Sequence, residues 1–134
     1  MGVLSENRTA GIARWAPPIC WGVLVVLLSL LPDVFFFGTP KNDEARHLHY
    51  YIEVMVHVFQ SCVFFLLMLR PLRSTRRSRA AVVAAAFGAL LLLSLVNESV
   101  QAFTPTRMFD FVDMTMDALG GIVGLGLALA ADAV

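Results

Sequence analysis

The residues best suited to chemistry are ionisable side chains that stand against or inside long apolar segments. Most of them fall in one stretch between Asn97 and Gly124, NESVQAFTPTRMFDFVDMTMDALGGIVG. Ionisable groups at membrane depth are costly, and they usually face a bundle interior or a water-filled cavity. The stretch therefore predicts a polar site inside an apolar scaffold, where carboxylates could hold a metal ion, move protons or bind a polar ligand. The candidate site residues are Glu53, His57, Glu98, Gln101, Arg107, Asp110, Asp113 and Asp117.

The composition is that of a membrane protein with one domain. Of the 134 residues, 58% are hydrophobic and only 15% are charged, whereas charged residues make up about a quarter of a soluble domain. Because the net charge is zero, we expect no nucleic-acid partner, and we expect membrane lipids around the chain. Cys20 and Cys62 lie in apolar runs without the spacing of metal ligands, so we expect both to be packing residues.

Four apolar segments are long enough to cross a bilayer core as helices, which takes about 17–25 residues. They cover roughly residues 16–37, 50–69, 80–96 and 111–131. The first segment resembles a signal peptide, but no small-x-small cleavage site follows Leu31, which favours an uncleaved helix. The sequence therefore predicts an all-α, integral membrane four-helix bundle, forming a single domain over residues 1–134 in the cell (plasma) membrane.

The placement of lysine and arginine predicts the orientation of this bundle. Seven basic residues flank the segments on one side: Arg8, Arg14, Arg70, Arg73, Arg76, Arg77 and Arg79. The other side has three, which are Lys41, Arg46 and Arg107. We therefore expect both termini and the arginine-rich connection to be cytoplasmic, where that connection could also contact anionic lipid head groups.

Helical spacing brings the candidate residues together from three segments. In the second segment, Glu53, His57 and Gln60 stand at i, i+4 and i+7, which places them on one face. Similar spacings relate Ser94, Glu98 and Gln101 in the third segment, and Asp110, Asp113 and Asp117 in the fourth. With the predicted orientation, all of these residues fall in the outer half of the membrane or at its outer edge.

The acids of this layer must be partly neutralised. Glu53 and His57 are spaced to pair along their own helix, and Arg107 could form a bidentate pair with a carboxylate. Gly120 and Gly124 form a GxxxG motif on the face that carries Asp117, which allows close approach of another helix. The motif is compatible with internal packing or with dimerisation, and its alignment with the acidic face favours internal packing.

The corner between the third and fourth segments resembles the signature of the VanZ-like membrane proteins. The matching residues are Asn97, Glu98, Gln101, Phe103, Pro105, Arg107, Asp110, Asp113 and Gly120, with Glu53 four residues before His57 as a partner motif. The chain departs from the family pattern at Val54, Thr106 and Asp117, where Lys, Gly and Asn are usual. The resemblance implies a small bacterial four-helix membrane protein of the cell envelope, in a family whose founding member is associated with resistance to the glycopeptide antibiotic teicoplanin.

Four interpretations of the polar site stay open. The favoured one is a binding site for an envelope lipid, a glycolipid head group or an amphiphilic drug, because Arg107 at the rim suits a phosphate or carboxylate. A second is a hydrogen-bonded network that only fixes helix packing. A third is a membrane-embedded hydrolase or transferase acting on a lipid, with a divalent metal as cofactor held by Glu53, His57, Glu98, Asp113 and Asp117. A transporter or channel is the fourth, and it would require an oligomer.

Overall fold

The structure, a computed structural model, describes residues 11–31, 42–103 and 107–132. The described residues form four helices: α2 (Ala16–Ser29), α4 (Asp43–Arg73), α5 (Arg79–Gln101) and α6 (Phe111–Asp132). All four, α2 together with the turn that precedes it, are long and apolar enough to cross a membrane. The expected all-helical architecture with four membrane-length helices is therefore confirmed.

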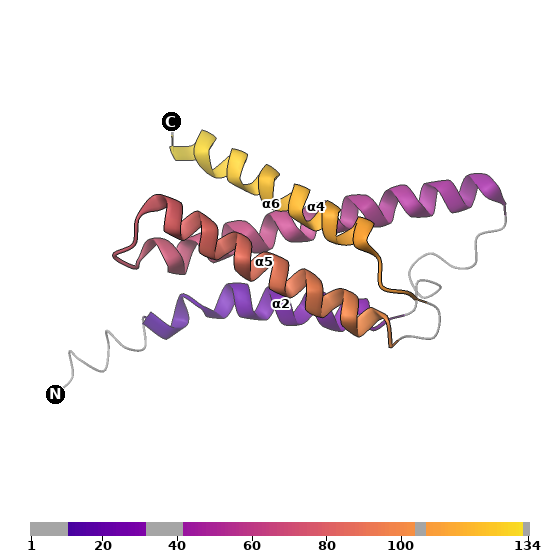
Figure 1. The fold of residues 1–134 in the computed structure, drawn as a ribbon, viewed down its shortest axis with the longest axis horizontal. Coiled ribbons are helices and arrows are strands. Elements are labelled where there is room, and N and C mark those ends of the chain that lie inside the picture. The colour runs from indigo at the N-terminus through magenta and orange to yellow at the C-terminus, as the bar shows by residue number, and fades with distance from the viewer. Residues whose placement is uncertain (1–10, 32–41, 104–106, 133–134) are drawn as a thin grey trace.

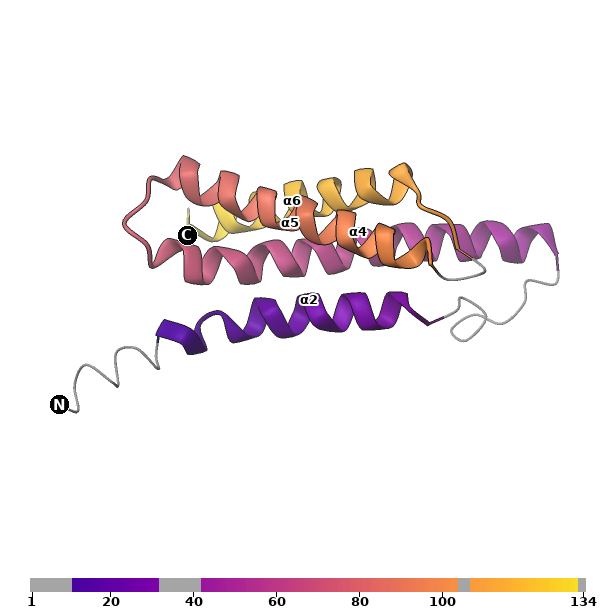
Figure 2. The same cartoon turned by 60° about the horizontal axis from the view of Figure 1, so that its bottom comes forward.

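Three of the helices form a tight group, and the fourth lies along one side of it. α6 packs most extensively against α4, and α5 packs against both. α2 contacts α4 and α5 and lies along them on the far side from α6 (Figures 1 and 2). The indole of Trp21 in α2 donates a hydrogen bond of 3.0 Å to the backbone carbonyl of Gln60, which ties α2 to α4. We call the end where α4 begins, α5 ends and α6 begins the site end, and the opposite end the arginine end.

The helix bounds differ from the expected segments where polar residues extend a helix beyond its apolar part. α4 begins at Asp43 rather than near Tyr50, because the Asn42 side chain accepts a hydrogen bond from the Ala45 amide and Asp43 and Glu44 favour the first turn. α5 continues past Val96 to Gln101, which places Glu98 on the helix. α2 ends at Ser29, and the part of the first segment from residue 32 to residue 37 lies outside the described residues.

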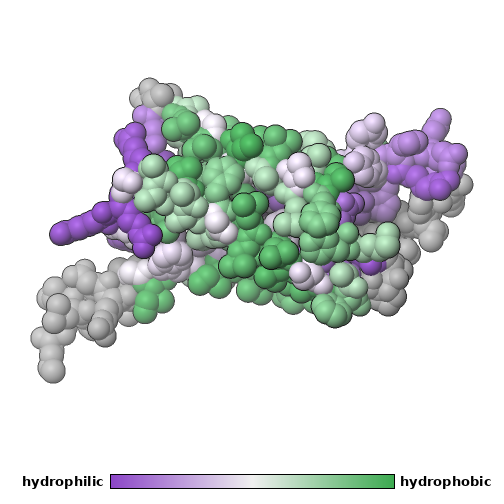
Figure 3. Space-filling model, in the orientation of Figure 1, coloured by the Kyte–Doolittle hydropathy of each residue, from purple (hydrophilic) through white to green (hydrophobic). Residues whose placement is uncertain are grey.

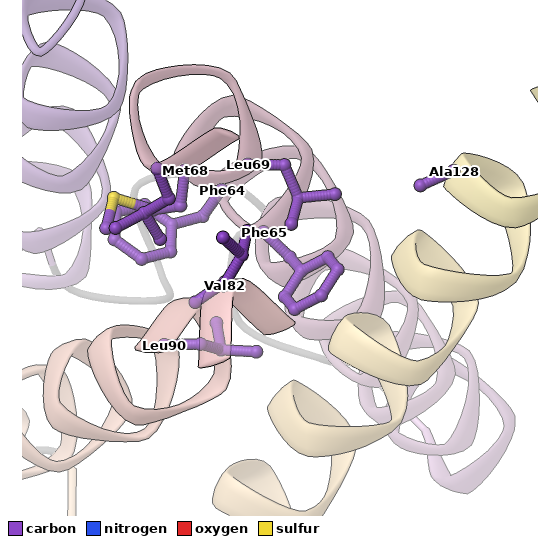
Figure 4. Close-up of a cluster of buried hydrophobic side chains, with 9 residues drawn as sticks. Phe64, Phe65, Met68, Leu69, Val82, Leu90 and Ala128 are labelled. Atoms are coloured by element: carbon purple, nitrogen blue, oxygen red, sulfur yellow. The ribbon is translucent and has the colours of Figure 1, made fainter. Parts of the chain in front are cut away.

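An apolar core fills the half of the bundle nearer the arginine end. Its nine buried residues come from α4, α5 and α6, and Phe65, Ala86 and Leu90 are almost completely buried (Figure 4). The face of the molecule seen in Figure 3 carries a broad apolar band with hydrophilic residues at both ends. A surface apolar around its middle and polar at its ends is what a bilayer-spanning bundle presents to lipid and water.

The glycines of α6 let this helix lie close to its neighbours. A Cβ atom at Gly120 would collide with the backbone carbonyl of Val58 and lie 2.9 Å from the Ser61 Cβ, both in α4. A Cβ at Gly124 would lie 3.1 Å from the Cys62 carbonyl oxygen. The GxxxG motif thus faces α4 within the same chain, and it brings the Asp117 face of α6 against the His57 face of α4.

Candidate functional site

The site is a polar cluster buried between α4, α5 and α6 in the half of the bundle nearer the site end. Asp117 lies at its centre and is 1% exposed. Its Oδ1 accepts hydrogen bonds from the Ser61 hydroxyl at 2.6 Å and from His57 Nδ1 at 3.1 Å, while its Oδ2 accepts one from the Ser94 hydroxyl at 2.6 Å. These three contacts join α4 and α5 to Asp117 of α6, so this carboxyl group links the three helices.

His57 is held in one orientation by this carboxylate. With a carboxylate oxygen as the acceptor, Nδ1 of His57 is the protonated nitrogen and donates a hydrogen bond to Asp117. The side-chain amide of Gln60 lies 3.4 Å from the same nitrogen, a longer contact than the 3.1 Å to the carboxylate. The other ring nitrogen, Nε2, faces Asp113 with 3.6 Å between Nε2 and Oδ2.

Glu98 differs from Asp117 in how its oxygens are paired. Its side chain is 0% exposed, and its Oε2 accepts a hydrogen bond of 3.1 Å from the Asp110 backbone amide. Its Oε1, also buried, has no hydrogen-bond partner among the described residues, and the same is true of Asn97 Oδ1. One ligand atom each of His57, Glu98 and Asp113 lies within 4.8 Å of the other two, which is compact enough for a metal ion.

A pocket of about 200 Å³ opens beside the cluster, between α2, α4, α5 and Arg107. Its lining combines polar and apolar side chains: Val25, Leu28, Ser29, Glu53, Val56, His57, Gln60, Asn97, Gln101 and Arg107. Arg107 Nη2 lies 3.8 Å from Glu53 Oε1. Burial lowers the pKa of the Arg107 guanidinium, an effect that the charge of Asp113 opposes, and an arginine keeps its charge in either case.

One expected interaction does not form, and one candidate residue has a different role. Glu53 pairs with Arg107 and with His49, at 3.8 Å in each case, and not with His57. Asp110 is exposed, and its Oδ1 accepts a hydrogen bond of 2.7 Å from the Val112 amide. Asp110 therefore caps the start of α6, where an acidic side chain satisfies a free amide, and only its backbone reaches Glu98.

The remaining candidates meet at the site. Glu53, Gln101 and Arg107 line the pocket, His57 lies between pocket and cluster, and Glu98, Asp113 and Asp117 belong to the cluster. Ser61 was not among the predicted site residues, although it stands four residues after His57 on the same face. Asn97 also lines the pocket, and its place beside Glu98 was the available signal.

Comparison with known proteins identifies the family of this chain. The sequence profile of the VanZ/LLP1 family matches residues 5–132. The chain therefore belongs to the VanZ/LLP1 family, and it is a multi-pass membrane protein with a buried His/Asp/Glu cluster. Searches of curated proteins and of solved structures gave no match.

Proposed function

We propose that this VanZ/LLP1 family member binds the polar head group of a membrane amphiphile, an envelope lipid or a glycolipid, in the site-end pocket. The observation that carries the proposal is that the lining of this pocket combines apolar side chains with hydrogen-bond donors. Val25, Leu28 and Val56 offer apolar contacts, while Arg107, Gln60 and Gln101 offer donors for phosphate, carboxylate or hydroxyl oxygens. A ligand with one polar and one apolar part matches such a lining.

The size of the pocket limits what can enter it. Pockets for drug-sized ligands measure about 300–1,000 Å³, and this one measures about 200 Å³. It suits one head group or a single sugar, with the hydrocarbon part of the ligand left in the bilayer. A second, wholly apolar groove of about 480 Å³ runs along α2 towards the arginine end, between Val23 and Phe64, and could accept an acyl chain.

The placement of basic residues supports a pocket on the outer side of the membrane. Arg70, Arg73, Arg76, Arg77 and Arg79 lie at the arginine end, and basic residues favour the cytoplasm. With that end inside, the site end faces the outer leaflet of the cell membrane. An outer-leaflet pocket would meet envelope lipids and amphiphilic drugs.

A lipid inventory tests the proposal. The full chain is purified in mild detergent from its membrane, and the bound lipids are compared by native mass spectrometry for wild type, Arg107→Gln and Arg77→Gln. We expect one amphiphile to be enriched over the membrane extract in wild type and in Arg77→Gln, whose substitution lies at the arginine end. Arg107→Gln should reduce it about tenfold, since a charge-assisted hydrogen bond is lost. Equal lipid content in all three proteins would refute the proposal.

A further inference from the structure

The pairing of Glu98 leaves one buried carboxyl oxygen without a hydrogen-bond partner among the described residues. The side chain is 0% exposed, one oxygen accepts a single backbone hydrogen bond, and Oε1 has no partner among the residues that the structure describes. A native protein pairs nearly all of its buried polar atoms, so an exception calls for a specific cause such as a proton or an ion. The position of the neighbouring groups decides between these causes.

His57 supplies the second observation. With Nδ1 hydrogen-bonded to Asp117, Nε2 is the ring nitrogen left for a further partner, and it lies 3.6 Å from Asp113 Oδ2. This distance is too long for a direct hydrogen bond and leaves space for a cation between the two atoms. The arrangement in which a carboxylate orients one nitrogen of a histidine while the other nitrogen faces acids is typical of metal ligands.

We propose that His57 Nε2 and the carboxylates of Glu98 and Asp113 bind a first-row divalent cation, Zn²⁺ or Mn²⁺. The three ligand atoms lie within 4.8 Å of one another. Ligand atoms around a tetrahedral zinc ion are about 3.4 Å apart, as follows from bond lengths of about 2.1 Å. The separation of 3.6 Å between His57 Nε2 and Asp113 Oδ2 is already close to this value.

The charges and the ligand types both favour this cation. Glu53, Glu98, Asp113 and Asp117 surround the site end of the bundle, and Arg107 is the one guanidinium that approaches them among the described residues. A divalent ion would offset the negative charge that these carboxyl groups carry when they are ionised. Imidazole nitrogen together with carboxylate oxygen suits zinc, manganese or iron better than magnesium or calcium, which take oxygen ligands only.

The proposed cation lies next to the pocket and leaves room for a further ligand. His57 belongs both to the metal-ligand set and to the pocket lining, whereas Glu98 and Asp113 belong only to the former. Three protein ligands leave at least one coordination position for water or a ligand oxygen. Metal binding is inferred from the pairing of Glu98 and His57, and it does not rest on the proposed head-group binding.

Metal binding by the full-length protein in detergent tests the inference. The purified protein is stripped with a chelator and titrated with Zn²⁺, Mn²⁺ and Co²⁺ separately, by calorimetry and, for Co²⁺, by visible absorption. The variants are Glu98→Gln and Asp113→Asn, which keep side-chain shape and remove a ligand charge. Asp110→Asn is the matched control, because this exposed acid at the same end offers no side-chain ligand and asparagine also caps helices.

We expect wild type and Asp110→Asn to bind one equivalent of cation, and Glu98→Gln and Asp113→Asn to lose stoichiometric binding. Should Glu98→Gln fail to fold, as judged by its helical circular dichroism, Asp113→Asn decides, since Asp113 is partly exposed and less embedded. The inference is overturned if wild type binds none of the three ions. It is equally overturned if a folded Asp113→Asn variant binds them as wild type does, because the ion would then lie elsewhere.

Discussion

Two buried carboxyl groups, Asp117 and Glu98, lie in the same polar layer and are paired in opposite ways. Asp117 is 1% exposed and receives three hydrogen bonds from side chains of α4 and α5. Glu98 is 0% exposed and receives one, from a backbone amide. The difference shows that burial alone does not tell what an acid does in a membrane protein. We conclude that Asp117 holds the helices together, and we propose that Glu98 is kept for a ligand.

The largest effect on stability is expected from Asp117→Ala. This substitution leaves Ser61, Ser94 and His57 without their common acceptor, at about 1 kcal/mol for each interhelical contact. We expect a loss of about 3 kcal/mol in the free energy of unfolding, measured by steric trapping in bicelles. Asp43→Ala, at the exposed start of α4, is the control and should change little. A loss under 1 kcal/mol for Asp117→Ala would show that its hydrogen bonds do not hold the helices.

The next largest effect should come from separating α6 from α4. In Gly120→Ala the new methyl group meets the Val58 carbonyl and the Ser61 Cβ, so the helices must move apart where Ser61 and Asp117 meet. Such overpacking costs about 1–3 kcal/mol. Gly126→Ala is a matched control on the same helix, because a Cβ there has no described neighbour within 4 Å. Similar unfolding free energies for the two variants would contradict the close packing of α4 and α6.

The smallest effect is expected at the arginine end, where charges are paired near water. Arg73 donates two hydrogen bonds to Asp132, of 3.1 and 3.0 Å, and both side chains are about half exposed. Asp132→Asn should cost less than about 1 kcal/mol, because exposed ion pairs are weak, and the difference should shrink at high salt. A loss as large as that of Asp117→Ala, at any salt concentration, would show that this end is buried rather than hydrated.

The sequence predicted the helices and the corner of the site well, because hydropathy and helical spacing are local properties. The i, i+4 spacing of Glu53 and His57 correctly placed both residues on the helix face that lines the site. It could not show which residue each of them would pair with. Arg107 and Asp117 come from other parts of the chain, and they replace the expected pair between Glu53 and His57. The extension of α4 to Asp43 was missed since a hydropathy window registers only the apolar part of a helix.

The sequence could not predict which of the buried acids has all of its oxygens hydrogen-bonded and which does not. Whether a carboxyl group is fully paired depends on hydroxyl groups that arrive from two other helices, Ser61 and Ser94. The role of Asp110 was within reach, because an aspartate directly before an apolar helical segment is a common cap. Asp110 stands three residues before Asp113 and seven before Asp117. This spacing fits a residue on the site face of the helix as well as it fits a helix cap, so spacing alone could not distinguish the two roles.

Two isosteric substitutions, Asp117→Asn and Glu98→Gln, compared in the same bicelles, separate the roles of the two buried acids most directly. The measured quantity is the free energy of unfolding of each variant relative to wild type, without added metal. We expect Asp117→Asn to cost about 2 kcal/mol more than Glu98→Gln, because asparagine replaces one acceptor oxygen with an NH2 donor and so leaves at least one of the three buried donors without its acceptor. Equal losses, or a larger loss for Glu98→Gln, would contradict the claim that one buried acid holds the fold and the other is kept for a ligand.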